Sequence, residues 1–78
     1  MELKNLTQIE TDEDVLVIEI NGGHRFKDKI EAVGLRTGIK IRKLSTQVFG
    51  GPVTVKIGSS KIALGYGMAK RIFVQVKK

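Results

Sequence analysis

Runs in which apolar and polar residues alternate cover most of the chain and predict β-strands. Residues 15–20 are rich in β-branched side chains and too short for a typical helix. They predict a strand with Leu16, Ile18 and Ile20 on one face and Glu19 on the other. Four further strands are predicted, at residues 39–44, 53–57, 61–64 and 72–76.

In one segment the apolar residues recur with the period of an α-helix. Phe26, Ile30 and Val33 stand at positions i, i+4 and i+7, so they share one face of a helix predicted over residues 24–33. Gly34 follows the last residue of this pattern and is able to adopt the left-handed conformation that ends many helices.

Turn residues separate the strands. Gly and Ser at 58–60 predict a β-hairpin, Gly and Pro at 49–52 predict a loop, and residues 68–71 allow one helical turn. Residues 1–10 are expected to add a turn or to lie over the domain. Because an open sheet of five strands would expose two edges, a small closed barrel is expected, with one short helix between its first and second strands.

Length and composition limit the number of domains and the kinds of functional site that this chain is able to have. The chain has 78 residues, which is enough for one domain, expected to span 1–78. It has no cysteine, which excludes disulfides and thiolate metal sites.

All eight acidic residues stand at or before Glu31, whereas ten basic residues and no acid follow it. This asymmetry suggests a nucleic acid, an anionic membrane or an acidic protein as partner, or a charge that serves solubility alone.

The strand over residues 39–44 carries part of this basic charge. Its alternation places Ile39 and Ile41 inward and Lys40 and Arg42 outward, with Lys43 at the margin. A folded basic face is therefore expected, not a disordered basic tail.

Neither a metal site nor a catalytic site is expected from the residue types. His24 is the one histidine, and with Asp28 four residues later it is at most a weak candidate for an adventitious transition metal. The alternative for His24 is a residue at the start of the helix. The serines Ser45, Ser59 and Ser60 lack any signature of a nucleophile. No cofactor and no enzymatic reaction are expected.

Nucleic acid remains an alternative partner. A surface that binds single strands needs exposed aromatic side chains beside the cations. The aromatic residues are Phe26, Phe49, Tyr66 and Phe73, of which Phe49 and Tyr66 stand in predicted loops. This number is small for stacking, so nucleic acid is the less favoured partner.

Three segments stand in a characteristic order along the chain. The first reads G-L-R-T-G at 34–38 and precedes a basic strand, and the second reads F-G-G-P-V at 49–53. The third combines I-A-L-G at 62–65 with M-A-K-R-I-F-V at 68–74. In this order and spacing, over about residues 15–76, the chain resembles the FeoA family (ferrous iron transport protein A). It also resembles the C-terminal domain of iron-dependent repressors of the diphtheria-toxin-repressor type.

The resemblance implies an SH3-like β-barrel and an accessory or regulatory role in bacterial ferrous-iron uptake. It implies interaction with the membrane permease FeoB, and hence a cytoplasmic protein recruited to the inner face of the plasma membrane. Two alternatives stay open, a metal-responsive module that partners a transcriptional repressor and a nucleic-acid-binding barrel. The glycines and proline of the 49–52 loop also have a purely structural explanation as turn residues. The expected partner-binding residues are Lys40, Arg42, Lys43, Phe49, Gly50, Gly51, Pro52 and Tyr66.

Overall fold

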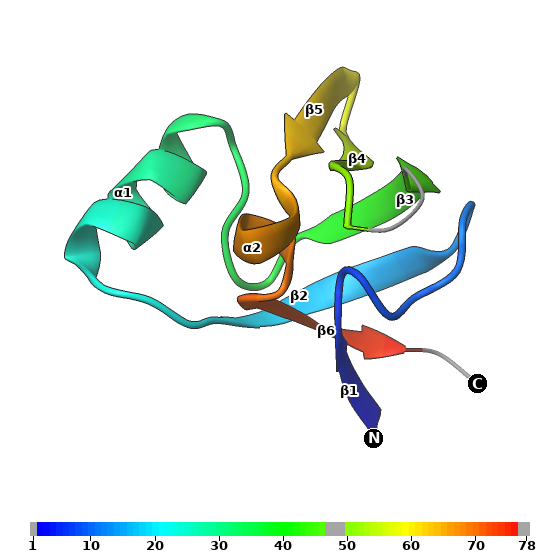
Figure 1. Cartoon of the computed structure of the whole chain (residues 1–78), viewed down its shortest axis with the longest axis horizontal. Coiled ribbons are helices and arrows are strands. Elements are labelled where there is room, and N and C mark those ends of the chain that lie inside the picture. Colours follow the sequence, from blue (N-terminus) through cyan, green and yellow to red (C-terminus); the bar gives the residue numbers. More distant parts are fainter. Residues whose placement is uncertain (1, 47–49, 77–78) are drawn as a thin grey trace.

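The computed structural model describes residues 2–46 and 50–76, which form six strands and two short helices (Figure 1). In chain order these are β1 (Glu2–Asn5), β2 (Asp14–Ile20), α1 (His24–Ala32), β3 (Lys40–Thr46), β4 (Val53–Ile57), β5 (Ser60–Leu64), α2 (Tyr66–Ala69) and β6 (Ile72–Val76). The strands form one antiparallel sheet in the order β1-β6-β2-β3-β4-β5. The mainly β fold confirms the sequence prediction, with six strands in place of five.

β1 is the strand that the sequence pattern did not reveal. It pairs along its whole length with β6, beginning with Glu2 opposite Val76. Its four residues contain no β-branched side chain, so its extended conformation depends on the pairing with β6. The chain then turns inward, and Leu6 and Ile9 are buried. Residues 2–9 therefore form part of the folded domain.

β2 contains a bulge that changes which side chains reach the interior. Its pairing with β6 shifts register between Val17 and Glu19, so one extra residue is accommodated there. Val15, Val17 and Ile20 are buried, whereas Leu16 is exposed. The prediction that Leu16 shares a face with Ile20 is therefore wrong, because the bulge breaks the alternation between the two residues.

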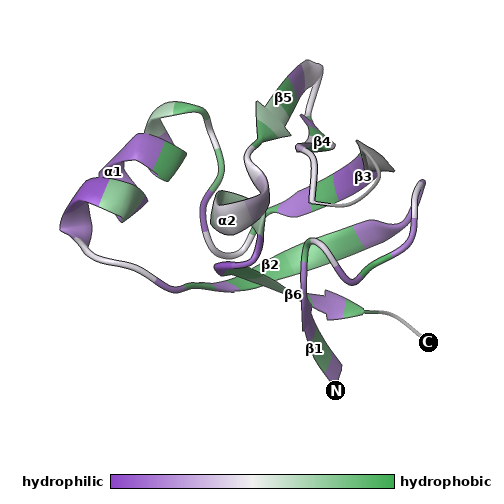
Figure 2. Ribbon diagram, viewed as in Figure 1, coloured by the Kyte–Doolittle hydropathy of each residue, from purple (hydrophilic) through white to green (hydrophobic). Residues whose placement is uncertain are grey.

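Apolar side chains from every strand except β1 meet in one core. The buried members are Leu6, Ile9, Val15, Val17, Ile20, Ile30, Leu35, Ile41, Val53, Val55, Leu64, Ala69, Ile72 and Val74. β6 and β5 lie near opposite ends of the strand order, yet both contribute side chains to this single cluster. The sheet is therefore curled and not flat. Figure 2 shows the hydrophobic residues along β2 and the mostly hydrophilic residues of α1.

α1 lies to one side of the sheet and is anchored mainly by Ile30, which is fully buried (Figure 1). Gly34 has a φ of 94°, and its N–H donates to the Glu31 carbonyl. The Leu35 N–H donates to the Ile30 carbonyl, and the Leu35 side chain is buried. This pair of bonds is a Schellman motif and confirms the predicted end of the helix. Val33 is exposed, so its assignment to the buried face was wrong, because the chain leaves the helix at that residue.

The predicted hairpin is formed by β4 and β5. Ile57 pairs with Ser60, which leaves a two-residue turn in which Gly58 has a φ of 60°. Glycine at the first turn position suits the type II′ geometry that matches strand twist. The predicted helical turn near residues 68–71 is present as α2, which begins slightly earlier, at Tyr66.

Candidate interaction face

The antiparallel pairing gathers basic side chains on the outer face of the sheet. Arg42 stands opposite Lys56, and Lys56 stands opposite Lys61, so the three side chains form a row across β3, β4 and β5. Residues directly opposite each other share a face, with Cβ atoms about 4.5–5.5 Å apart. All three residues are exposed. Lys40 lies two residues before Arg42 in β3 and therefore projects to the same side.

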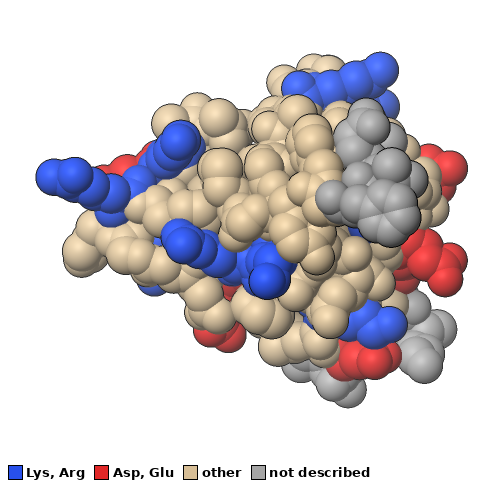
Figure 3. Space-filling view, in the orientation of Figure 1, with Lys and Arg blue, Asp and Glu red and all other residues tan. Residues whose placement is uncertain are grey.

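Basic side chains stand at several separate places on the face of the molecule that Figure 3 shows. Figure 3 shows Lys and Arg side chains on the β4–β5 hairpin, on α1 and near the centre of the view, whereas acidic groups lie mostly at its margins. The net charge is +6. A surface of this kind favours encounter with an acidic partner.

Arg42 is the member of the row that has an acidic partner. Its Nε and Nη2 atoms donate to the two carboxylate oxygens of Asp14 at 2.8 and 3.0 Å. The hydrogen bond to Asp14 and the charge of that carboxylate raise the pKa of the Arg42 guanidinium above its ordinary value. Within residues 2–46 and 50–76, this is the one salt bridge, so Lys40, Lys56 and Lys61 face solvent without an ion pair.

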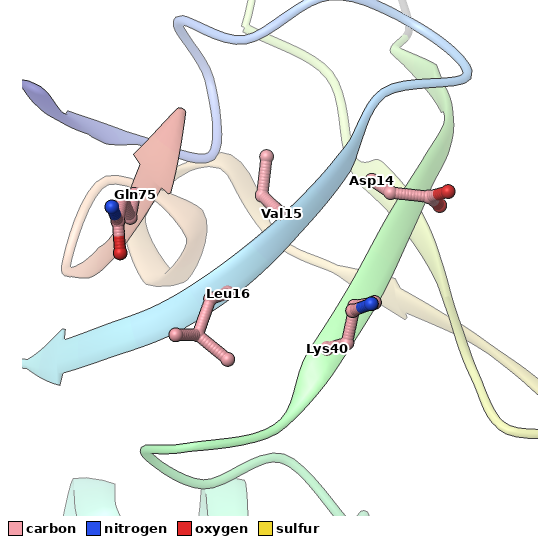
Figure 4. Close-up of a pocket in the computed structure, with 5 residues that line it drawn as sticks. All are labelled: Asp14, Val15, Leu16, Lys40 and Gln75. Atoms are coloured by element: carbon pink, nitrogen blue, oxygen red, sulfur yellow. The ribbon is translucent and has the colours of Figure 1, made fainter. Parts of the chain in front are cut away.

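A shallow hollow adjoins the cations. It has a volume of about 370 Å³ and is lined by Asp14, Val15, Leu16, Lys40 and Gln75. Leu16 pairs with Lys40 of β3 on one side and with Gln75 of β6 on the other. Figure 4 shows the Leu16 side chain between these two neighbours, with Val15 pointing to the opposite side of β2. The outer face thus combines the exposed aliphatic side chain of Leu16 with a group of cations.

Lys43 does not belong to this face. Its side chain is 2% exposed, and Nζ donates to the Ile9 carbonyl at 2.6 Å. Burial lowers the pKa of the Lys43 ammonium, and the nearby charge of Glu13 opposes that shift. The expectation that Lys43 lies at an exposed margin is wrong, because strand alternation turns it to the same side as Ile41.

The loop residues predicted for partner binding lie elsewhere. A Cβ added to Gly50 would stand 3.9 Å from the Tyr66 ring, so the loop before β4 and the start of α2 are neighbours. Tyr66 is 39% exposed, and Lys70 Nζ lies 5.7 Å from the centre of its ring. Pro52 is exposed and Gly51 is half-buried.

The predicted partner-binding residues therefore form two groups. Lys40 and Arg42 stand at the beginning of β3, whereas Gly50 follows the end of that strand. Arg42 and the last residue of β3, Thr46, are four residues apart, or about 13 Å, so these groups lie toward opposite ends of β3. Phe49 lies outside the described residues.

Sequence reasoning missed four residues of the outer face: Leu16, Lys56, Lys61 and Gln75. The opposition of Lys56 and Lys61 had a local signal, since a two-residue turn at Gly58 places them across from each other. Leu16 and Gln75 had no such signal, because their pairing joins strands far apart in the sequence.

The weak metal candidate gains no support from its surroundings. His24 is exposed at the first position of α1, and Asp28 is exposed one turn later. Among the described residues, no group of three His, Cys, Asp or Glu side chains lies close enough to hold a metal ion. No helix in the described part of the chain is long and apolar enough to cross a membrane.

Comparison with known proteins identifies the fold and the family. Residues 4–76 match the sequence model described as FeoA domain. A curated relative from Methanocaldococcus jannaschii, named Fe(2+) transport protein A, is 32% identical over 63 residues, which cover 81% of this chain and 74% of the relative. The crystal structure of an iron uptake regulatory protein (FeoA) superposes with a TM-score of 0.85 at 28% identity, covering 96% of this chain and 97% of that one.

The fold also occurs within larger proteins. A manganese-dependent transcriptional repressor superposes with a TM-score of 0.87 at 21% identity, and the match covers 96% of this chain and 42% of the repressor.

A second protein of similar length has the same fold. An FeoA-like protein from Clostridium acetobutylicum superposes with a TM-score of 0.85 at 24% identity, covering 100% of this chain and 91% of that one. These likenesses confirm the predicted SH3-like fold.

Proposed function

This chain belongs to the FeoA domain family of ferrous-iron transport proteins, and from that premise we propose that it is a non-enzymatic accessory protein of iron uptake. It acts as a single domain over residues 1–78 and binds the cytosolic part of the membrane permease FeoB. It works in the cytoplasm and reaches the inner face of the plasma membrane through the permease.

The observation that carries the proposal is the match of residues 4–76 to the FeoA domain. The outer face of the sheet supports a binding mechanism, because it holds three exposed lysines without an ion pair among the described residues. Charges arranged in this way increase the rate of encounter with an oppositely charged surface and help select the partner.

Ferrous-iron uptake by a strain that lacks this protein tests the proposal. The parent chain is expected to restore uptake, whereas the double variant Lys40→Glu, Lys56→Glu is not, at equal protein level. Both lysines are exposed, so their replacement costs little stability, on the order of 0–1 kcal/mol. Arg42 is left unchanged, because a glutamate there would stand opposite Asp14.

The control places the same charge change on α1, as Lys27→Glu, Lys29→Glu, and is expected to restore uptake like the parent. If the strain without the protein takes up ferrous iron normally, the transport role is wrong. If the outer-face variant restores uptake fully, the role of this face is wrong.

Two binding measurements separate the alternative partners. The parent chain is expected to retain the cytosolic fragment of the permease in a pull-down and to leave a random DNA duplex unshifted at physiological salt. Micromolar binding of the duplex that is lost in the outer-face variant would replace this proposal with the nucleic-acid function. Retention of a metal-dependent repressor in place of the permease fragment would favour the repressor-partner function.

A further inference from the structure

We propose that the outer face of the sheet binds a short acidic segment that carries one apolar anchor side chain. The binding patch consists of Leu16, Lys40, Arg42, Lys56, Lys61 and Gln75. This inference rests on the proposed function, and it specifies the chemistry of the permease segment that this protein recognises.

The apolar half of the patch surrounds Leu16. This side chain is 36% exposed and lies between Lys40 and Gln75 in the register of the sheet. The hollow beside it has a volume of about 370 Å³ and is flanked by the stems of these polar residues (Figure 4). Leu3 of β1, 44% exposed, stands opposite Gln75 and continues the apolar surface. One aliphatic or aromatic side chain of a partner would remove Leu16 from water.

The cationic half of the patch favours an acidic partner. Lys56 stands directly between Arg42 and Lys61, and among the described residues Arg42 is the one of these three cations that has an ion pair, with Asp14. Like charges directly opposite each other on neighbouring strands destabilise a sheet. Carboxylates bound over Lys56 and Lys61 would relieve this repulsion. The strand spacing of about 4.8 Å places the cations at intervals that neighbouring acidic side chains of one segment are able to match.

The composition of the patch favours a protein segment over other anionic partners. Single-stranded nucleic acid binds where aromatic side chains stack on bases, and the six patch residues include no aromatic ring. Stable attachment to a membrane needs a larger apolar insertion or a denser group of cations than two leucines and the three lysines that have no ion pair among the described residues. A hollow of about 370 Å³ has room for one large apolar side chain of a peptide.

Chemical-shift mapping of the isotope-labelled full chain with the cytosolic fragment of the permease tests the inference. The amides of Leu16, Lys40, Lys56 and Lys61 are expected to shift most. Lys61→Glu and Leu16→Ser are each expected to weaken binding at least tenfold. The control Lys29→Glu makes the same charge change on α1 and is expected to alter binding less than twofold. All three positions are exposed, and the amide spectrum of each variant verifies its fold.

Overlapping peptides from the permease fragment then identify the segment. The tightest peptide is expected to contain at least two acidic residues beside one large apolar residue, and to lose binding when the acids become Gln. If the fragment binds but the shifts gather around Gly50 and Tyr66, the inference is wrong while the proposed function stands. A neutral or basic peptide as the tightest binder also overturns it.

Two further outcomes would assign the patch to another occupant and overturn the inference. One is tighter binding of vesicles containing phosphatidylglycerol than of the fragment. The other is self-association of the chain in sedimentation that Lys61→Glu abolishes. If neither the fragment nor any of its peptides binds, the proposed function and this inference both fall.

Discussion

Lys43 is the one charged side chain that is buried among the described residues. Its ammonium donates to the Ile9 carbonyl, and the Lys43 backbone N–H and carbonyl also bond to the segment 12–13. Asp12, in the same segment, has a φ of 68°, a backbone conformation that side chains other than glycine seldom adopt. Lys43 therefore ties the N-terminal segment to β3 from inside the domain.

The buried ammonium predicts a pH dependence of stability. Folding lowers the pKa of Lys43, and burial of the ammonium is the largest cause. At pH values below this lowered pKa, Lys43 is protonated in both the folded and the unfolded protein, so the free-energy cost of burying its charge does not change with pH. As the pH rises above it, the folded state loses its proton before the unfolded state does. The free energy of unfolding then increases until the ordinary lysine value of about 10.5 is reached.

Urea unfolding of the parent and of Lys43→Met, from neutral pH up to the ordinary lysine pKa of about 10.5, measures this effect. The parent is expected to gain stability relative to the variant as the pH rises. At neutral pH the variant leaves the Ile9 carbonyl without its donor, at a cost of about 1–3 kcal/mol, which the removal of a buried charge partly offsets. A constant difference between the two proteins over this range would contradict the prediction.

At the scale of elements, short-range geometry decides where α1 ends and how β4 turns into β5. Gly34 and Gly58 both have positive φ values, and both stand where a helix or strand reverses direction. The outer-face cations depend on the second of these turns, because it sets Lys56 opposite Lys61.

Gly34→Val is expected to be strongly destabilising. The φ of 94° at this position strains a β-branched residue by about 1–3 kcal/mol, although an added Cβ would have no atom within 4 Å beyond those of the adjoining residues. This is a large share of the 5–15 kcal/mol typical of small domains. Thermal melting checks it, with Gly67→Val as the control. Gly67 lies in α2 without a positive φ or a neighbour within 4 Å. Similar melting temperatures for the two variants would show that backbone strain is not the cause.

Lys61→Glu is expected to stabilise the free protein while it weakens partner binding. The substitution replaces a like-charge pair across β4 and β5 with an opposite-charge pair, which contributes about 0.2–1 kcal/mol. Calorimetric melting at low salt should show a higher Tm, and the gain should shrink at 1 M salt, where charges are screened within about 3 Å. A lower Tm at low salt would mean that Lys56 and Lys61 do not repel each other.

At the scale of the whole molecule, the N-terminal segment completes the core. Leu6 is fully buried, and its N–H donates to the Ala69 and Ile72 carbonyls at 3.3 and 3.1 Å. The chain therefore returns from β1 across the region between α2 and β6. Since a domain of this size buries only about 60% of the surface of its unfolded chain, each such contribution matters.

Leu6→Ala is expected to lower the free energy of unfolding by about 2–5 kcal/mol, because it leaves a cavity in the core. The control is Leu3→Ala, three residues earlier, where the side chain is 44% exposed and the expected loss is below about 1 kcal/mol. Chemical denaturation measures both variants. Equal losses would mean that the N-terminal segment is not part of the cooperative core.

Local patterns in the sequence were sufficient for β3, β4, β5, β6 and α1. Each has its own period, and the turns at Gly34 and Gly58 follow from glycine's freedom at positive φ. The outward direction of Lys40 and Arg42 was predictable for the same reason. These features depend on neighbours a few residues away.

The tertiary structure alone decided the features that depend on distant partners. Residues 15–20 are apolar on both faces, so only the bulged pairing with β6 determines that Val15 and Val17 lie inside and Leu16 outside. Burial of Lys43 requires a carbonyl 34 residues away, and β1 becomes a strand only against β6. The row from Arg42 to Lys61 likewise needs β3 to pair with β4. The local backbone determined the individual strands, and the register between strands determined which side chains share a face.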